Sequence, residues 1–168
     1  MRHLFWTKWG FHWRDIKLET RWGRDGDRAE PYQTVLSVGR LRLHCFHRGD
    51  HDPDAHDHMW DFKTFPFTSY LEEVTEKGQL RQNLVQRLRW HHRPAEYAHR
   101  VLHRVGGSGR IWTFVIVGKK RRDWGFHVRI VMPVYAGFSR VPYHVKTWRW
   151  VPWREYIYGE KNDTSEKT

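Results

Sequence analysis

The sequence has little that would tie the chain to an oxidising compartment or to a membrane. Its 168 residues include one cysteine, Cys45, so no internal disulfide bond can form. No stretch approaches the roughly 20 apolar residues of a membrane-spanning helix, and the N-terminus lacks the apolar segment of a secretory signal peptide. These absences predict a cytoplasmic protein with no membrane partner.

Several motifs of common enzyme classes are also missing. The chain has no Gly-x-Ser-x-Gly motif, no phosphate-binding glycine-rich loop and no dinucleotide fingerprint. It shows no long amphipathic helical pattern and no internal repeat, and its length is that of one domain. The sequence therefore argues against the enzyme classes that depend on these motifs and against a repeat protein.

Positive charge is abundant, with 30 Lys and Arg against 19 Asp and Glu, a formal net charge of +11. Such a balance attracts anionic substrates and polyanions, so nucleic acid is a candidate partner. The alternative is solvated surface charge without a specific partner. The densest cationic stretch, residues 119–122, lies between two apolar runs and predicts a turn.

Apolar and polar residues alternate along many short segments, which is the pattern of half-buried strands. Predicted strands cover residues 34–47, 65–74, 80–90, 99–105, 111–117, 124–132 and 144–153. Residues 111–117 are almost continuously apolar, which predicts a central strand, and Pro152 is expected to begin one helical turn through Tyr156. Short strands between glycine and proline turns predict an all-β barrel or sandwich.

Nine of the thirteen histidines fall in two groups, within residues 44–58 and 91–103, and the sharpest feature is His56-Asp57-His58. Residues two apart on a strand share a face, so these two imidazoles can bind one metal ion. His99, which opens a predicted strand five residues after Pro94, is the candidate third ligand. Polar loop residues are the alternative interpretation of an isolated His-x-His, but the downstream proline and histidine favour a metal site.

Both histidine motifs resemble those of the cupin superfamily, in which a glycine precedes His-x-His and a later histidine follows a proline. Gly49 lies at about the right distance before His56, and residues 94–99 keep the spacing of the second motif. Residues 56–62, 119–126 and 150–156 are also similar to small uncharacterised cupin-like proteins of bacteria and phages.

The resemblance implies a single-domain, all-β, cupin-type double-stranded β-helix, also called a jelly-roll barrel. The barrel would span residues 34–156. An N-terminal extension, 1–33, would pack on it, and residues 157–168 would form a flexible tail. The resemblance alone also implies pairing into a homodimer.

The sequence departs from the family pattern at the fourth ligand. The family's glutamate would fall near Phe62 or Lys63, neither of which can ligate, so Asp61 is the first candidate. His103 stands where the family has asparagine, on the predicted face of His99, and is the second; water is the third. Two histidines with a carboxylate would favour Fe(II), while three histidines suit Zn, and Mn or Ni also fit imidazole.

Candidate substrate-binding residues flank the predicted metal. Arg42 and His44 alternate with an apolar face and are expected to point into the barrel, with a solvent-facing arginine as the alternative. Trp60 and Trp124 are candidate pocket walls, with core packing as the alternative.

These residues suggest three functions. The leading one is a metal-dependent enzyme, with Fe(II) oxygenation first, acting on a small polar or anionic molecule. The second is a non-enzymatic, metal-stabilised binding module whose basic surface recruits nucleic acid or a phage or host protein. The third is a metal-free, sugar-nucleotide epimerase-like cupin that would use Tyr70, Tyr97 or Tyr143 as its acid.

Overall fold

A computed structural model describes residues 8–13, 15–22, 31–76, 79–134 and 143–159. Its strands are β1 (Lys8–Trp13), β2 (Ile16–Arg21), β3 (Gln33–Val38), β4 (Leu41–Phe46), β5 (Ala55–His56), β6 (Phe62–Pro66), β7 (Tyr70–Glu76), β8 (Gln79–Val85), β9 (His91–Arg93), β10 (Ala98–Arg104), β11 (Ile111–Val117), β12 (Gly125–Val134) and β13 (Tyr143–Pro152). One helix, α1 (Trp153–Tyr158), follows Pro152, as the sequence predicted. Most of the predicted C-terminal tail, residues 160–168, lies outside the described residues.

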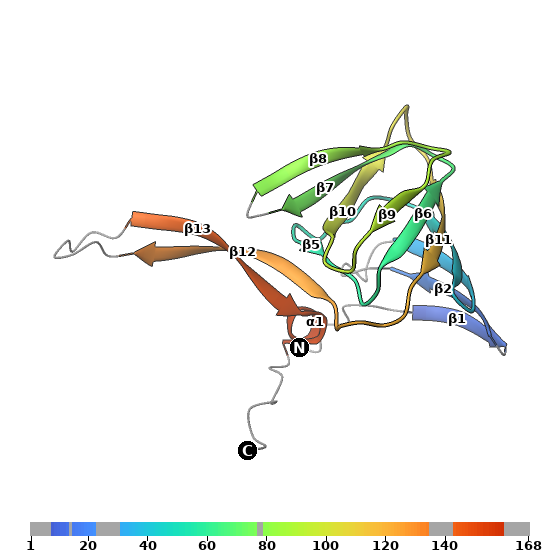
Figure 1. Ribbon diagram of the computed structural model, residues 1–168, viewed down its shortest axis with the longest axis horizontal. Helices are drawn as coiled ribbons and strands as arrows, with labels where there is room; N and C mark the ends of the chain where they lie inside the picture. Colours follow the sequence, from blue (N-terminus) through green and yellow to red (C-terminus); the bar gives the residue numbers. More distant parts are fainter. Residues whose placement is uncertain (1–7, 14, 23–30, 77–78, 135–142, 160–168) are drawn as a thin grey trace, which may run out of the picture.

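The strands form two antiparallel sheets. Sheet A has the order β1-β2-β3-β4-β11-β6-β9, and sheet B has the order β13-β12-β5-β10-β7-β8. Within them β4 pairs with β11, β5 with β10, β6 with β9 and β7 with β8. Consecutive strands from β4 to β7 alternate between the sheets, so the chain from β4 to β11 is one long folded-over hairpin (Figure 1). This is the jelly roll, the architecture of cupins, and it confirms the predicted fold class.

Three predicted strands are shorter than expected. The run 34–47 divides into β3 and β4 at Gly39, whose φ of +56° turns the chain. The run 65–74 divides into β6 and β7, which lie in different sheets. The run 80–90 ends as a strand at Val85, because Leu88 adopts a left-handed φ of +59° and breaks the alternation.

The inner face of sheet A is largely polar. Cross-strand register aligns Glu19, Val35, His44 and Thr113 in one row. A neighbouring row contains Ser37, Arg42, Val115 and Thr64. Glu19, Ser37, Thr64 and Thr113 are all buried, so these rows line the interior of the barrel.

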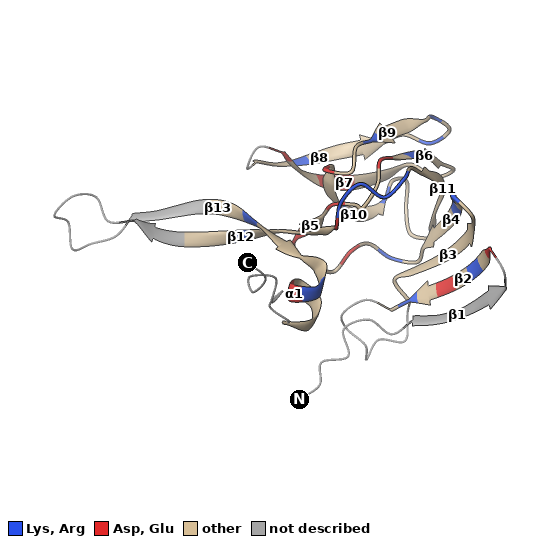
Figure 2. Cartoon of the chain, turned by 60° about the horizontal axis from the view of Figure 1, so that its bottom comes forward, with Lys and Arg blue, Asp and Glu red and all other residues tan. Residues whose placement is uncertain are grey.

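Strands β12 and β13 form an arm that leaves the body of the barrel (Figure 1). They pair over ten residue pairs, whereas β12 meets β5 only at Phe126 and His127. Beyond His127 the arm is therefore a two-stranded ribbon, as both views show (Figure 2). No helix in the described part of the chain is long and apolar enough to cross a bilayer.

Candidate metal centre

Backbone pairing between β5 and β10 brings the three predicted histidines together. His56 lies directly opposite His99 in the antiparallel register. The backbone N–H of His58 donates to the carbonyl of Ala95, 2.9 Å away, which ties the two histidine motifs together. The result is a cluster in which one nitrogen of each ring lies within 4.8 Å of the others.

The protonation of His56 and His58 suits them to bind a cation. Burial, with the neighbouring rings, holds the pKa of His58 well below its ordinary value. Burial and His99 lower the pKa of His56 to about 4, although Asp50 opposes that shift. Both rings are therefore neutral at pH 7, and a neutral imidazole is the form that binds a metal.

A buried carboxylate, Glu72 on β7, supports the cluster from behind. Its Oε2 accepts a hydrogen bond from Nδ1 of His99 at 2.8 Å. Its Oε1 accepts from Nη2 of Arg93 at 2.9 Å, Nδ2 of Asn83 at 2.8 Å and the Tyr97 hydroxyl. Burial alone would raise the pKa of Glu72, but hydrogen bonds and charges from His99 and Arg93 outweigh it and lower the pKa to about 2. Glu72 is therefore an ionised acceptor.

The Glu72 contact fixes which nitrogen of His99 is available. Because Nδ1 donates to the Glu72 carboxylate, Nε2 is the nitrogen of His99 that is left to bind a metal, and it lies 3.0 Å from Nε2 of His58. Two nitrogens about 2.1 Å from one ion can lie this close to each other. The three residues thus fit a divalent ion.

Aromatic side chains enclose the cluster on two sides. Phe62 lies 4.6 Å from His58 between ring centroids, and Trp124 and Phe126 lie 6.1 and 6.0 Å from His56. Trp124 is itself stacked on Trp153 of α1, at 5.7 Å and an interplanar angle of 9°. The predicted wall residue Trp124 thus borders the site, and the apolar surroundings strengthen electrostatic interactions within it.

Asp61 and His103, the candidate fourth ligands, lie away from the three rings. The Asp61 carboxylate accepts a hydrogen bond from the backbone N–H of Ala95 at 2.8 Å and pairs with Arg121. Its role is to hold the loop that precedes β10. The group of three histidines includes no further His, Cys, Asp or Glu from the described residues.

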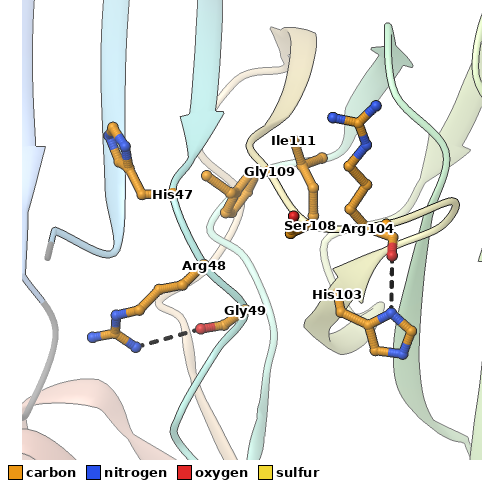
Figure 3. A pocket seen from close by; sticks show the side chains of 10 residues that line it. His47, Arg48, Gly49, His103, Arg104, Ser108, Gly109 and Ile111 are labelled. Carbon is orange, nitrogen blue, oxygen red and sulfur yellow. Dashed lines mark hydrogen bonds between the residues drawn. The ribbon is translucent and has the colours of Figure 1, made fainter.

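His103 is displaced by a β-bulge. The register of β10 against β7 shifts between Val101 and His103, so the period of two that would align His103 with His99 is broken. His103 is exposed, and its Nδ1 bonds the carbonyl of Arg104 at 3.0 Å (Figure 3).

His103 instead lines a pocket of about 200 Å³ that is separate from the histidine cluster and lies beside the 106–109 loop. Figure 3 shows the guanidinium groups of Arg48 and Arg104 extending to opposite sides of this pocket. The pocket therefore has no pair of arginines converging on one anion.

The predicted substrate residues Arg42 and His44 both lie on the inner face of sheet A. His44 pairs across the strands with Thr113, and its Nδ1 lies 3.2 Å from Nε2 of Gln33. Arg42 donates to Ser37 Oγ at 3.3 Å, and its guanidinium lies 5.0 Å from the Trp60 ring centroid. Trp60 itself packs against a buried cluster of Phe62, Val115 and Val117, so it combines core packing with the cation–π contact.

The sequence analysis did not identify Glu72 as a site residue. It also did not identify the two residues that lie with Arg42 and His44 on the inner wall. Gln33 and Glu19 lie before the predicted barrel, and both are buried on its inner wall. The available indication was the alternation Tyr70, Glu72, Val74, which puts a carboxylate among inward-facing apolar positions.

No protein-family model and no curated protein matches the chain. Among solved structures it is similar to Fe(II)-HppE with the alternative substrate (S)-1-HPP, at 11% identity and a TM-score of 0.43, over 54% of this chain and 52% of that one. A cupin domain from Bordetella pertussis shows 12% identity and a TM-score of 0.37, over 71% of this chain and 99% of that one.

Hydroxypropylphosphonic acid epoxidase from S. wedmorenis shows 8% identity and a TM-score of 0.39, over 66% of this chain and 55% of that one. The chain thus spans about half the length of the HppE and epoxidase chains and nearly all of the cupin domain. Because these TM-scores are all below 0.5, the fold is assigned from the strand order of the two sheets and not from the similar structures.

Proposed function

We propose that the protein is a metal-dependent cupin enzyme, with Fe(II)-type oxygenation as the leading reaction and a small anionic or polar molecule as substrate. The observation that supports it is the convergence of His56, His58 and His99, with His99 oriented by buried Glu72. An Fe(II) ion held by these three nitrogens would supply redox chemistry and open coordination positions.

An anionic substrate is supported by the charge of the inner wall. Arg21 and Arg42 both belong to this wall, and Glu19 is the carboxylate that partners Arg21, with 3.4 Å between Nη2 and Oε2. Nε of Arg42 is buried and has no hydrogen-bond partner among the described residues. A carboxylate or phosphonate bound there would satisfy this donor and offset the excess positive charge.

The chain's own residues have separate tasks in this proposal. Arg42 and His44 would bind and orient one end of the substrate, while Phe62 and Trp124 would exclude water from the other end. Glu72 would keep the proton of His99 on Nδ1. Together they would define a reaction space inside the barrel with fixed polar groups on one wall.

Metal content tests the proposal directly. Protein reconstituted with Fe(II) without oxygen should bind one ion per chain, and His58→Ala and His99→Ala should each lose it. His92→Ala, which alters an exposed histidine on β9, is the matched control. Unchanged metal content in both site variants would refute the metal centre, and metal binding without substrate-dependent oxygen uptake would refute the oxygenase assignment.

A second candidate, a nucleic-acid-binding module, is supported by the arm. Residues 125–152, from the start of β12 to the end of β13, contain four Lys and Arg and no Asp or Glu. Arg129 is exposed, and the Arg149 side chain is 62% exposed although it lies 3.5 Å from Glu155. A two-stranded ribbon of this kind fits the major groove of DNA.

Mobility-shift measurements at several salt concentrations separate this candidate from general charge attraction. Replacing both Arg129 and Arg149 with Glu should abolish binding if the arm is the site, since phosphate contacts dominate such affinities. The control is a double variant of equal net charge, with Arg81→Glu on β8, at the opposite edge of sheet B, and Arg87→Glu in the turn that follows β8. Equal loss in both double variants, or no binding by wild type at low salt, would exclude the arm.

A further inference from the structure

The outer face of sheet A is apolar where an antiparallel sheet usually meets water with polar residues. The cross-strand register aligns Leu18, Leu36, Leu43, Phe114 and Phe65 in one row over five strands. The next row contains Ile16, Val38, Leu41 and Ile116 and ends at Lys63.

Aromatic rings extend the first row beyond the last paired strand. Trp90 lies 5.2 Å from Phe65 and 6.3 Å from Phe114 between ring centroids, and Phe67 lies 5.7 Å from Phe65. Trp112, the next outward residue along β11, extends the patch beside Phe67, whose backbone N–H donates to the Trp112 carbonyl at 2.8 Å. The whole set, here called the outer apolar face, is therefore continuous from β2 to the loop after β8.

Many of these side chains are open to solvent. Trp90 is 54% exposed, Phe67 48% and Trp112 39%. Leu36, Val38 and Leu41 are 38%, 45% and 45% exposed and lie among the other members of the two rows. A contiguous apolar surface of this extent is a mark of an interaction site.

Charge is nearly absent from the outer apolar face. Strands β3 and β11 contain no Asp, Glu, Lys or Arg (Figure 2). The single charged residue of β4, Arg42, faces inward, because it lies opposite Ser37 and Val115. Lys63 lies at the end of its row. In a chain with a net charge of +11, this is a surface that a second copy could approach with little repulsion.

We propose that a second copy of this chain packs its own outer apolar face on this one, about a two-fold axis near Leu43. Leu43 is the middle residue of the five-strand row, with aliphatic Leu18 and Leu36 on one side and aromatic Phe114 and Phe65 on the other. With the axis parallel to the strands, the rotation sets the aliphatic half of each copy against the aromatic half of its partner. Small groups then face large ones, which is how two sheet faces interdigitate.

The available area suits a dimer of ordinary size. At about 200 Å² for a whole aromatic side chain, Trp90, Phe67 and Trp112 leave roughly 300 Å² of ring surface open. The exposed leucines and valines of the two rows add to this. A stable interface buries about 800 Å² on each partner, so the apolar patch would form the centre and the surrounding polar residues the rim.

Sedimentation velocity of the purified full chain tests the proposal. Wild type should sediment with twice the 20.6 kDa of one chain, and it should do so at 1 M salt as well as at low salt, because the interface is apolar. Leu36→Glu should raise the dimer dissociation constant by at least about 100-fold, since it buries an unpaired charge. Val38→Glu should act in the same direction.

The control is Leu84→Glu, which changes a leucine of sheet B that is 47% exposed. It should leave the dimer intact, and circular dichroism should show all three variants folded. Because Leu36 and Val38 point outward, their substitution leaves the interior unchanged. A wild type that is monomeric up to about 100 µM would overturn the proposal, because even weak interfaces have micromolar dissociation constants. So would a dimer that survives Leu36→Glu and Val38→Glu, or one that only Leu84→Glu or high salt dissociates.

Discussion

Replacing Glu72 by Gln is the sharpest test of how the histidine cluster is organised. The carboxylate is fully buried and accepts from four donors, among them Nδ1 of His99 at 2.8 Å and Arg93 at 2.9 Å. Gln has one acceptor oxygen, so its amide NH₂ must face at least one former donor. If that donor is His99, the ring is forced to present Nδ1 as an acceptor and to move its proton to Nε2, the atom that would bind the metal.

The expected loss can be estimated from two effects. Removing a partner that orients a metal ligand costs about 10- to 100-fold in metal affinity, or about 1.4–2.7 kcal/mol. Leaving Arg93 buried without its carboxylate costs the metal-free protein about 3 kcal/mol of unfolding free energy. We therefore expect Glu72→Gln to bind Co(II) or Zn(II) at least tenfold more weakly and to unfold at lower denaturant.

Competition against a chelator of known affinity measures the first effect, and urea unfolding of the metal-free protein measures the second. The matched control is Glu73→Gln on the opposite face of β7, where the carboxylate pairs with Arg100 at 2.8 Å. The control should keep wild-type metal affinity. A folded Glu72→Gln protein that binds metal within twofold of wild type would refute the positioning role.

Three further predictions concern other parts of the barrel. Gly49→Ala should prevent folding or destabilise the protein severely in urea titrations, because a Cβ there would lie 1.8 Å from the carbonyl oxygen of Leu102. Burial, with the charges of nearby arginines, lowers the pKa of His44 to about 3, so the neutral ring stabilises the fold above pH 6.5 and this contribution falls as the pH drops toward 3. His44→Gln should therefore reduce the pH dependence of unfolding free energy between pH 6 and pH 4 by up to about 1.4 kcal/mol per pH unit, whereas His92→Gln should not. Trp124→Ala should weaken metal retention and lower the unfolding free energy by about 3 kcal/mol, since it removes the ring that stacks on Trp153; full stability of this variant would contradict the packing described.

Local patterns of the sequence were sufficient for much of the fold and for three site residues. The apolar run 111–117 forms β11, an interior strand of sheet A between β4 and β6. Its outward residues belong to the outer apolar face, so no polar alternation marks the strand. His56, His58 and His99 converge because each motif is short and local, and antiparallel pairing of β5 with β10 then sets the two motifs opposite each other.

The sequence-based strand predictions were wrong where a single backbone torsion ends a strand or where one extra residue reverses which side chains point inward. The bulge after Val101 turned His103 outward, and no residue type in that segment distinguishes a bulge from a regular strand. The turn at Gly39 divided a run of strand-forming residues, and the inward positions change from odd-numbered residues in β3 to even-numbered residues in β4. Glu72 was overlooked because its partners His99 and Arg93 are more than 20 residues away, and cross-strand register is set by the whole sheet.

Sheet A buries several polar residues on its inner wall while its outer face is apolar, and this links the interior site to the outer apolar face. Burial of Glu19, Gln33 and Thr113 on the inner wall costs free energy that apolar residues there would not cost. Leu36 is exposed although its neighbours Val35 and Ser37 are buried. The fold therefore lacks the hydrophobic stabilisation that Leu36 would contribute if it pointed to the opposite face. Since neighbouring residues of a strand point to opposite faces, a slip of one residue in register would exchange the two faces and hide the apolar one. The register kept in β3 and β4 thus leaves polar groups buried and leucines exposed in an isolated barrel, and the proposed ligand at the inner wall and the proposed second copy on the outer face would offset both costs.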